Sequence, residues 1–229
     1  MKRLQILTCA VAVVLGGAVG QSATLVYDNS SNDLVIRFNP GPAEVGDEIL
    51  LAPGPERMIS TFTFQYWGEN FSGDEQIRVR FYANDAFYAS HNAFIAPGTL
   101  LYDSGPFSIP ATPRQTIVLD YATLLAGNSG NPVIVPDSFT WSVQFLNVNP
   151  GAGERAGLDI YDPPTTGWNY TSYWEKDPIQ GWLLKTNQFG IPMNFGARVE
   201  AVVPEPNVLA LGLGGGLLFL LARSRARRS

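Results

Sequence analysis

The chain has 229 residues, with 15 Lys or Arg against 20 Asp or Glu, a net charge of −5, one His and one Cys. A surface of this charge repels nucleic-acid phosphates and so excludes a nucleic-acid-binding protein. One His and one Cys are too few to supply a zinc site built from these ligands.

The N-terminus has the three parts of a secretory signal peptide. Lys2 and Arg3 supply positive charge, residues 4–19 are apolar, and small residues offer cleavage sites after Gly20 or Ala23. We expect residues 1–23 to direct the chain to the Sec export machinery, with an uncleaved anchor helix as the alternative. Cys9 lies in this segment, so the exported protein would contain no cysteine and no disulfide.

Residues 24–202 have the pattern of a β-rich body. Segments such as 62–66, 77–81 and 139–145 alternate apolar and polar side chains, as strands with one buried and one solvated face do. Pairs of turn-forming residues that include Gly and Pro separate the segments. The expected strands are 24–27, 34–38, 48–51, 59–67, 76–82, 100–102, 116–119, 139–146, 158–161, 181–185 and 194–202.

This pattern predicts an all-β fold, an antiparallel two-sheet β-sandwich of jelly-roll type, in a single domain. The only helical expectation within it is one turn at 121–127. Residues 24–203 contain nine basic and nineteen acidic residues, a net charge of −10. Such a charge favours solubility, and attraction of divalent cations is the alternative.

One segment of the body is unusually aromatic and is surrounded by turn-forming residues. Exposed aromatic rings often mark binding sites, and sugar rings could stack on them. The competing interpretation is that these side chains complete the core. The candidate carbohydrate-binding residues are Trp168, Tyr170, Tyr173, Trp174 and Trp182.

Catalytic and metal motifs are mostly missing from the sequence. His91 lies in an expected loop, and Ser104 lacks the Gly-x-Ser-x-Gly elbow of a hydrolase nucleophile, so we expect no enzyme of the Ser-His-Asp type. We expect no cofactor and no metal ligands, with two alternatives left open. Structural calcium could use the oxygen-rich positions 74–75, 84–85 and 159/162, and a pair of carboxylates could hydrolyse a glycosidic bond.

The C-terminus combines three features. Pro204, Glu205 and Pro206 precede an uncharged run, 207–222, which contains four Gly and would span roughly 24 Å as a helix. That length is marginal for crossing a bilayer, which suits a transient stop more than a permanent anchor. The run is followed at once by basic residues that the positive-inside rule would keep cytoplasmic, namely Arg223, Arg225, Arg227 and Arg228.

This order of motif, apolar helix and basic tip resembles the PEP-CTERM sorting signal of bacterial exported proteins. The resemblance covers residues 203–229 and implies that an integral-membrane exosortase cuts near the motif, so that the tail is removed after use, as in a GPI signal. It implies a body that is transiently anchored in the inner membrane, outside the cytoplasm, and then released to the cell surface or medium.

The body also resembles domains that often precede PEP-CTERM tails. This second resemblance supports the sandwich and supplies no catalytic residues. The segments that carry it are 46–49, 78–85, 101–105, 139–141 and 195–198.

Together these features predict an exported, exosortase-processed, non-enzymatic component of the envelope or extracellular matrix, associated with exopolysaccharide. The alternatives are a carbohydrate-binding module and a glycan-active hydrolase. The polysaccharide partner follows from the resemblance alone.

Overall fold

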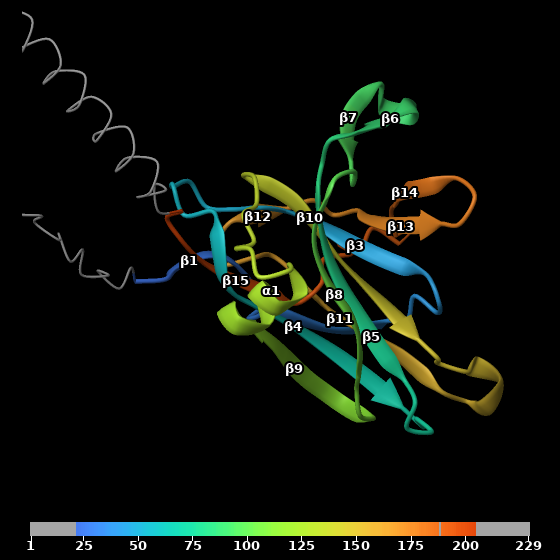
Figure 1. Cartoon of the computed structure of the whole chain (residues 1–229). Coiled ribbons are helices and arrows are strands. Elements are labelled where there is room, and N and C mark those ends of the chain that lie inside the picture. Colours follow the sequence, from blue (N-terminus) through green and yellow to red (C-terminus); the bar gives the residue numbers. More distant parts are fainter. Residues whose placement is uncertain (1–21, 188, 205–229) are drawn as a thin grey trace, which may run out of the picture.

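The computed structural model describes residues 22–187 and 189–204. Most of the predicted signal peptide and all of the tail beyond Pro204 therefore lie outside the described residues. Within them the chain is mostly β, and it forms two larger antiparallel sheets and one small hairpin (Figure 1). The predicted all-β, antiparallel sandwich class is confirmed.

The six-stranded sheet, sheet I, contains the first and last strands side by side. Its order is β1 (Thr24–Asn29), β15 (Ala197–Val202), β4 (Met58–Glu69), β11 (Arg155–Tyr161) and β2 (Asp33–Phe38), with β9 (Thr112–Asp120) also paired to β4.

The seven-stranded sheet, sheet II, carries the features on which the functional argument depends. Its order is β14 (Gly181–Lys185), β13 (Tyr173–Asp177), β3 (Glu44–Leu50), β10 (Ser138–Leu146), β5 (Gln76–Ala83) and β8 (Leu100–Ser108), with β12 (Trp168–Asn169) also paired to β3. The remaining elements are the hairpin β6 (Ala86–Tyr88) and β7 (Ala93–Ala96), the helix α1 (Tyr121–Gly127), and 3-10 turns at Ala89–His91 and Pro150–Ala152.

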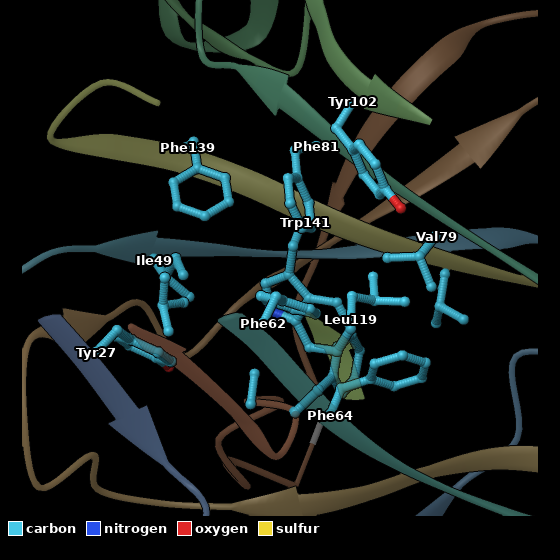
Figure 2. Close-up of a cluster of buried hydrophobic side chains, with 14 of the residues drawn as sticks. Tyr27, Ile49, Phe62, Phe64, Val79, Phe81, Tyr102, Leu119, Phe139 and Trp141 are labelled. Atoms are coloured by element: carbon cyan, nitrogen blue, oxygen red, sulfur yellow. The ribbon is translucent and has the colours of Figure 1, made fainter. Parts of the chain in front are cut away.

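The core lies between the two sheets and is built around aromatic rings (Figure 2). Trp141 of β10 is fully buried and packs edge-to-face on Phe62 of β4, with ring centroids 5.2 Å apart. Phe62 contacts Phe81 of β5 at 4.8 Å in the same manner, which adds to the energy of simple area burial. The alternating residues of β4, β5 and β10 thus close the sandwich from both sides.

Every expected strand corresponds to a strand of the structure, whereas β6, β7, β12 and β13 were not predicted. The strands β8 and β9 are longer than expected, and each contains a proline, Pro106 in β8 and Pro113 in β9. Among the described residues, each of these strands pairs with one neighbour only, β8 with β5 and β9 with β4. Proline is tolerated in such edge strands, where it removes no ladder hydrogen bond.

One expectation about β10 was wrong. Its polar residues were expected to face solvent, but Thr140 and Ser142 are fully buried. The outer face of sheet II is covered where β13, β14 and the turn end of the β6–β7 hairpin meet. There, the hydroxyl of Tyr88, the last residue of β6, accepts a hydrogen bond from the Leu184 amide of β14 at 3.2 Å. This cover leaves two clefts on the outer face.

Candidate functional site

The first cleft, which we name the Glu48 cleft, has a volume of about 520 Å³. It opens on the outer face of sheet II, at the end nearest the β6–β7 hairpin. Its lining combines three carboxylates, an amide, a hydroxyl, several apolar side chains and one aromatic ring. These residues are Glu48, Leu50, Ala83, Asn84, Asp85, Ile95, Pro136, Asp137, Ser138 and Tyr170.

A chain of side-chain hydrogen bonds fixes the polar groups of this cleft. The Thr140 hydroxyl donates to Asn84 Oδ1 at 2.7 Å, and Asn84 Nδ2 donates to Ser138 Oγ at 2.8 Å. Ser138 Oγ in turn donates to Glu48 Oε1 at 3.0 Å. These residues come from β10, β3 and the end of β5, so the paired strands preorganise the cleft.

The carboxylates of the cleft differ in their environments. Burial raises the pKa of Glu48, although the hydrogen bond from Ser138 opposes the shift. Asp85 accepts hydrogen bonds from the hydroxyl and the amide of Thr99, and these hold the pKa of Asp85 below its usual range. Asp137 is paired with Arg57 at 2.7 Å. A carboxyl with a raised pKa beside one with a lowered pKa is the arrangement from which acid and base roles can arise.

Two of the five candidate aromatic residues form an exposed pair at the rim of the Glu48 cleft. Trp168 is 50% exposed and Tyr170 is 42% exposed, and their rings meet edge-to-face with centroids 4.5 Å apart. Asn169, between them, points inward and donates to the Tyr27 hydroxyl at 3.0 Å. Because side chains alternate along β12, burial of Asn169 turns both rings outward.

The other three candidates pack against the protein. Trp174 is only 1% exposed and lies edge-to-face on Tyr88 at 5.1 Å, so a sugar cannot reach its ring in this structure. Tyr173 packs against Phe38 at 5.1 Å. Trp182 packs on Tyr82 at 5.4 Å and has the Lys176 ammonium 5.2 Å from its ring. The aromatic segment therefore divides into one exposed pair and three packing residues.

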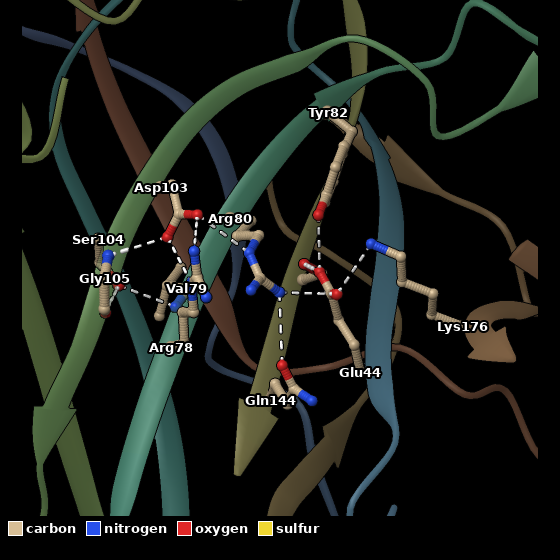
Figure 3. A network of polar contacts seen from close by, with 11 residues as sticks. Glu44, Arg78, Val79, Arg80, Tyr82, Asp103, Ser104, Gly105, Gln144 and Lys176 are labelled. Atoms are coloured by element: carbon tan, nitrogen blue, oxygen red, sulfur yellow. Dashed lines mark hydrogen bonds and ion pairs between the residues drawn. The ribbon is translucent and has the colours of Figure 1, made fainter. Parts of the chain in front are cut away.

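The second cleft, the Glu44 cleft, has a volume of about 800 Å³ and lies between β14 and the outer ends of β3 and β10. Glu44 accepts hydrogen bonds from Ser142 Oγ at 2.7 Å and the Tyr82 hydroxyl at 2.9 Å (Figure 3). It also forms ion pairs with Arg80 at 2.7 Å and Lys176 at 3.3 Å.

This network continues to the next strand. Arg80 reaches Asp103 of β8 at 3.2 Å, and Arg78 binds the same carboxylate through two nitrogens (Figure 3). Every carboxylate and guanidinium named here has a partner of opposite charge. We assign the network a structural role, because it joins β13, β3, β10, β5 and β8 across the outer face.

The ionisation of Glu44 follows from these contacts. Burial favours the protonated acid, but the hydrogen bond from Ser142 and the charges of Arg80 and Lys176 together outweigh it and lower the pKa of Glu44. The ionised form of Glu44 therefore stabilises the fold at neutral pH.

The sorting motif is only partly described. Pro204 lies in irregular chain just after β15, half-buried in a groove with Met58, Tyr121 and Ile134. The rest of the predicted signal lies outside the described residues, namely Glu205, Pro206, the run 207–222, Arg223, Arg225, Arg227 and Arg228. No helix among the described residues is long and apolar enough to cross a membrane.

The remaining chemical candidates have structural contacts. His91 stacks on Tyr88 at 5.2 Å, and Ser104 Oγ accepts from the Val79 amide and donates to the Gly105 carbonyl. Asp159, one of the calcium candidates, is paired with Arg114 at 2.8 Å. Over residues 22–187 and 189–204, no three His, Cys, Asp or Glu side chains are grouped so that they could hold a metal ion.

Comparisons of the chain with protein-family models, with curated proteins and with solved structures gave no match. The functional argument therefore depends on the geometry of the Glu48 cleft and on the sequence patterns at the two ends of the chain.

Replacing Glu44 with Ala should destabilise the protein by about 3 kcal/mol at pH 7, because it leaves the half-buried Arg80 and the Tyr82 and Ser142 hydroxyls without their shared acceptor. The pKa of Glu44 is lowered in the fold, so its contribution is complete above the ordinary glutamate value of 4.5 and is lost as the pH falls through the folded-state pKa. Urea unfolding at pH 7 and pH 3 measures both effects.

The matched control is Glu69→Ala, which removes an exposed partner of Arg37. An exposed pair contributes at most about 1 kcal/mol, so this variant should unfold almost like the wild type. A Glu44→Ala penalty that stays the same at pH 3 and pH 7 would contradict the assigned role of the ionised carboxylate.

Proposed function

We propose that this protein is an exported, exosortase-processed and non-enzymatic component of the envelope or extracellular matrix, which associates with polysaccharide through the Glu48 cleft. The observation that carries the binding proposal is the exposed Trp168–Tyr170 pair at the rim of a preorganised polar cleft. Flat rings beside a few fixed hydrogen-bonding groups suit the apolar faces and the hydroxyls of a sugar.

The charge of the cleft favours one class of polysaccharide. Glu48, Asp85 and Asp137 line it, and Arg57 is the one basic partner that contacts these carboxylates through an ion pair among the described residues. An acidic polymer would be repelled by this lining and by the net charge of the body. Neutral glycans are therefore the class we propose.

The processing proposal is supported by the position of Pro204 relative to β15. Sheet I finishes with β15 at Val202, and Pro204 follows at once in irregular chain. The Pro-Glu-Pro motif thus begins directly after the last strand, without a long linker. A membrane enzyme that recognises this motif would act close to a completed domain.

The finer fold assignment also belongs to this proposal. We propose a jelly roll, in which eight strands form two four-stranded sheets whose connections pass between the sheets. The strand orders β2-β11-β4-β9 and β3-β10-β5-β8 support it, because they have the alternating connectivity of two interlocked Greek keys. In this interpretation β1, β15 and β12–β14 extend the edges.

A second candidate function is glycan hydrolysis in the same cleft. It is favoured by the raised pKa of Glu48, which suits a general acid, and by Asp85, which lines the same cleft and has a lowered pKa. Binding and hydrolysis would share the exposed aromatic pair.

The binding proposal predicts that Trp168→Ala and Tyr170→Ala each weaken binding to neutral polysaccharides about tenfold, because each removes one stacking face. Stability should change by under about 0.5 kcal/mol, since both rings are exposed. Trp174→Ala should instead cost roughly 3–5 kcal/mol because its ring is buried. An array of neutral and uronic-acid polysaccharides, combined with thermal melts, measures both properties.

The matched control is Tyr121→Ala, whose ring is 40% exposed but lies in the groove near Pro204. It should bind like the wild type. If Trp168→Ala and Tyr170→Ala also bind like the wild type, the aromatic pair is not the binding surface.

The processing proposal predicts that Glu205→Ala leaves export intact and blocks removal of the tail, because the motif loses its only charge. Mass spectrometry of the exported protein distinguishes the two forms. Glu200→Ala, a nearby acidic residue in β15, should be processed normally. Wild-type exported protein that still carries residues 223–229 would refute processing.

The hydrolase candidate makes a separate prediction. If the cleft cleaves a glycosidic bond, the wild type should release reducing ends from a neutral polysaccharide that it binds, and Glu48→Gln should bind equally well but release about 100-fold fewer, since a general acid contributes at least this factor. Absence of release by the wild type would leave binding as the function of the cleft.

A further inference from the structure

A group of polar side chains is buried between the two sheets, behind the Glu48 cleft. It comprises Asn29 at the end of β1, Asp47 of β3, and Asn194 just before β15, with Asp162 beside them. Asp47 and Asn194 are fully buried, and Asn29 is 1% exposed. These positions are far apart in the sequence, so the fold itself brings the oxygens together.

Hydrogen bonds show that the group converges on residues 194 and 195. Asn29 Nδ2 donates to the carbonyl oxygens of Tyr161 at 3.0 Å and of Phe195 at 3.4 Å. Asp47 Oδ2 accepts from the Phe195 amide at 3.0 Å, so Asn29 and Asp47 both bind the main chain of one residue. Asn194 Nδ2 donates to Asp162 Oδ1 at 2.7 Å.

Each of three side chains leaves one polar oxygen unused in these contacts. The remaining side-chain oxygens, Asn29 Oδ1, Asp47 Oδ1 and Asn194 Oδ1, are buried and have no hydrogen-bond partner in the part of the chain that the structure describes. Buried polar atoms in folded proteins are nearly always paired, so three such atoms in one group need a physical explanation. All three are acceptors, so the group needs a donor or a positive charge, which a proton on Asp47 or a bound cation would supply.

The charges around Asp47 point to a cation. Its electrostatic neighbours include the acidic residues Glu48 and Asp162. Among residues 22–187 and 189–204, no Lys or Arg forms an ion pair with Asp47. Burial raises the pKa of Asp47 well above its usual range. A buried carboxylate without a basic partner is costly unless it takes up a proton or a metal ion compensates its charge.

We propose that Asn29, Asp47 and Asn194 bind a calcium ion, with Asp162 as a neighbouring acidic group. Calcium takes oxygen ligands from carboxylates, from the amide oxygens of Asn and from water, and tolerates irregular geometry. A single water molecule has two hydrogens and could satisfy only two of the three acceptors. One cation would bind all three acceptor oxygens and would link β1, β3 and the segment before β15 through a shared site.

The test is thermal unfolding of the purified full-length protein after treatment with a chelator, with and without millimolar calcium chloride. Calcium at about 100 times its dissociation constant should raise the Tm by about 5 °C or more. Asp47→Asn, which removes the charge and keeps the shape, should abolish this rise. No rise in the wild type, with no calcium found by elemental analysis of the untreated protein, would overturn the proposal.

Two further measurements keep the test decisive. Asp74→Asn makes the same chemical change in another acidic, oxygen-rich loop and should retain the calcium-dependent rise; loss of the rise in Asp74→Asn alone would place calcium elsewhere and refute this site. Terbium, which replaces calcium, should show luminescence sensitised by the neighbouring Tyr27 in the wild type, and calcium should displace it. Absence of this signal would also count against the site, even if Asp47→Asn does not fold.

Discussion

The alternation of side chains along β3 is the constraint on which both clefts and the buried polar group depend. Successive residues of a strand point to opposite faces, so Glu44 and Glu48 point outward while Val45, Asp47 and Ile49 point inward. One edge of β3 pairs with β10, and the other pairs with β12 and β13. A shift of one residue in this pairing would exchange the two sets of side chains and remove every site at once.

This arrangement lets polar clefts form on the outer face of a sheet without weakening the core. Trp141, Phe62 and Phe81 hold the inner face together through aromatic contacts. The outer face is joined by charges and hydrogen bonds, which are directional and need a fixed framework. The hydrogen-bonded pairing of β3, β10 and β5 provides this framework. Each strand contributes one polar side chain to the Glu48 cleft: Glu48 from β3, Ser138 from β10 and Asn84 from the residue after β5.

The sequence was sufficient to predict the strands whose apolar and polar residues alternate clearly, such as β4 and β5. It was insufficient for β3, whose expected start at residue 48 missed its first four residues, because Gly46 and Asp47 resemble a turn. It was also insufficient to predict β12 and β13, because their aromatic segment, which is rich in turn-forming residues, shows no clear alternation of apolar and polar side chains. Sheet II extends onto them only through pairing with β3, which is a tertiary interaction.

The same reasoning applies to the candidate site. The aromatic composition led to Trp168 and Tyr170, but could not separate them from the buried Trp174, since the separation depends on which face of β12 or β13 each residue occupies. Asn84 and Asp85 were noticed as an oxygen-rich pair. Their partners Glu48 and Ser138 could not be predicted, because they lie on other strands and become neighbours only through the register of β3, β10 and β5.

Gly46 gives the outer face a further property. It pairs across the strands with Trp174, and a Cβ atom at this position would come within 2.7 Å of the Thr140 methyl group, so only glycine fits there. The indole of Trp174 therefore stands on the same face of sheet II as Glu44 and Glu48, level with the residue midway between them. Those two carboxylates are four residues apart on one strand, roughly 13 Å, yet their pKa values shift in opposite directions. The tryptophan thus lies between two unlike environments on one sheet surface: positive neighbours favour the ionised form of Glu44, whereas burial favours the protonated form of Glu48.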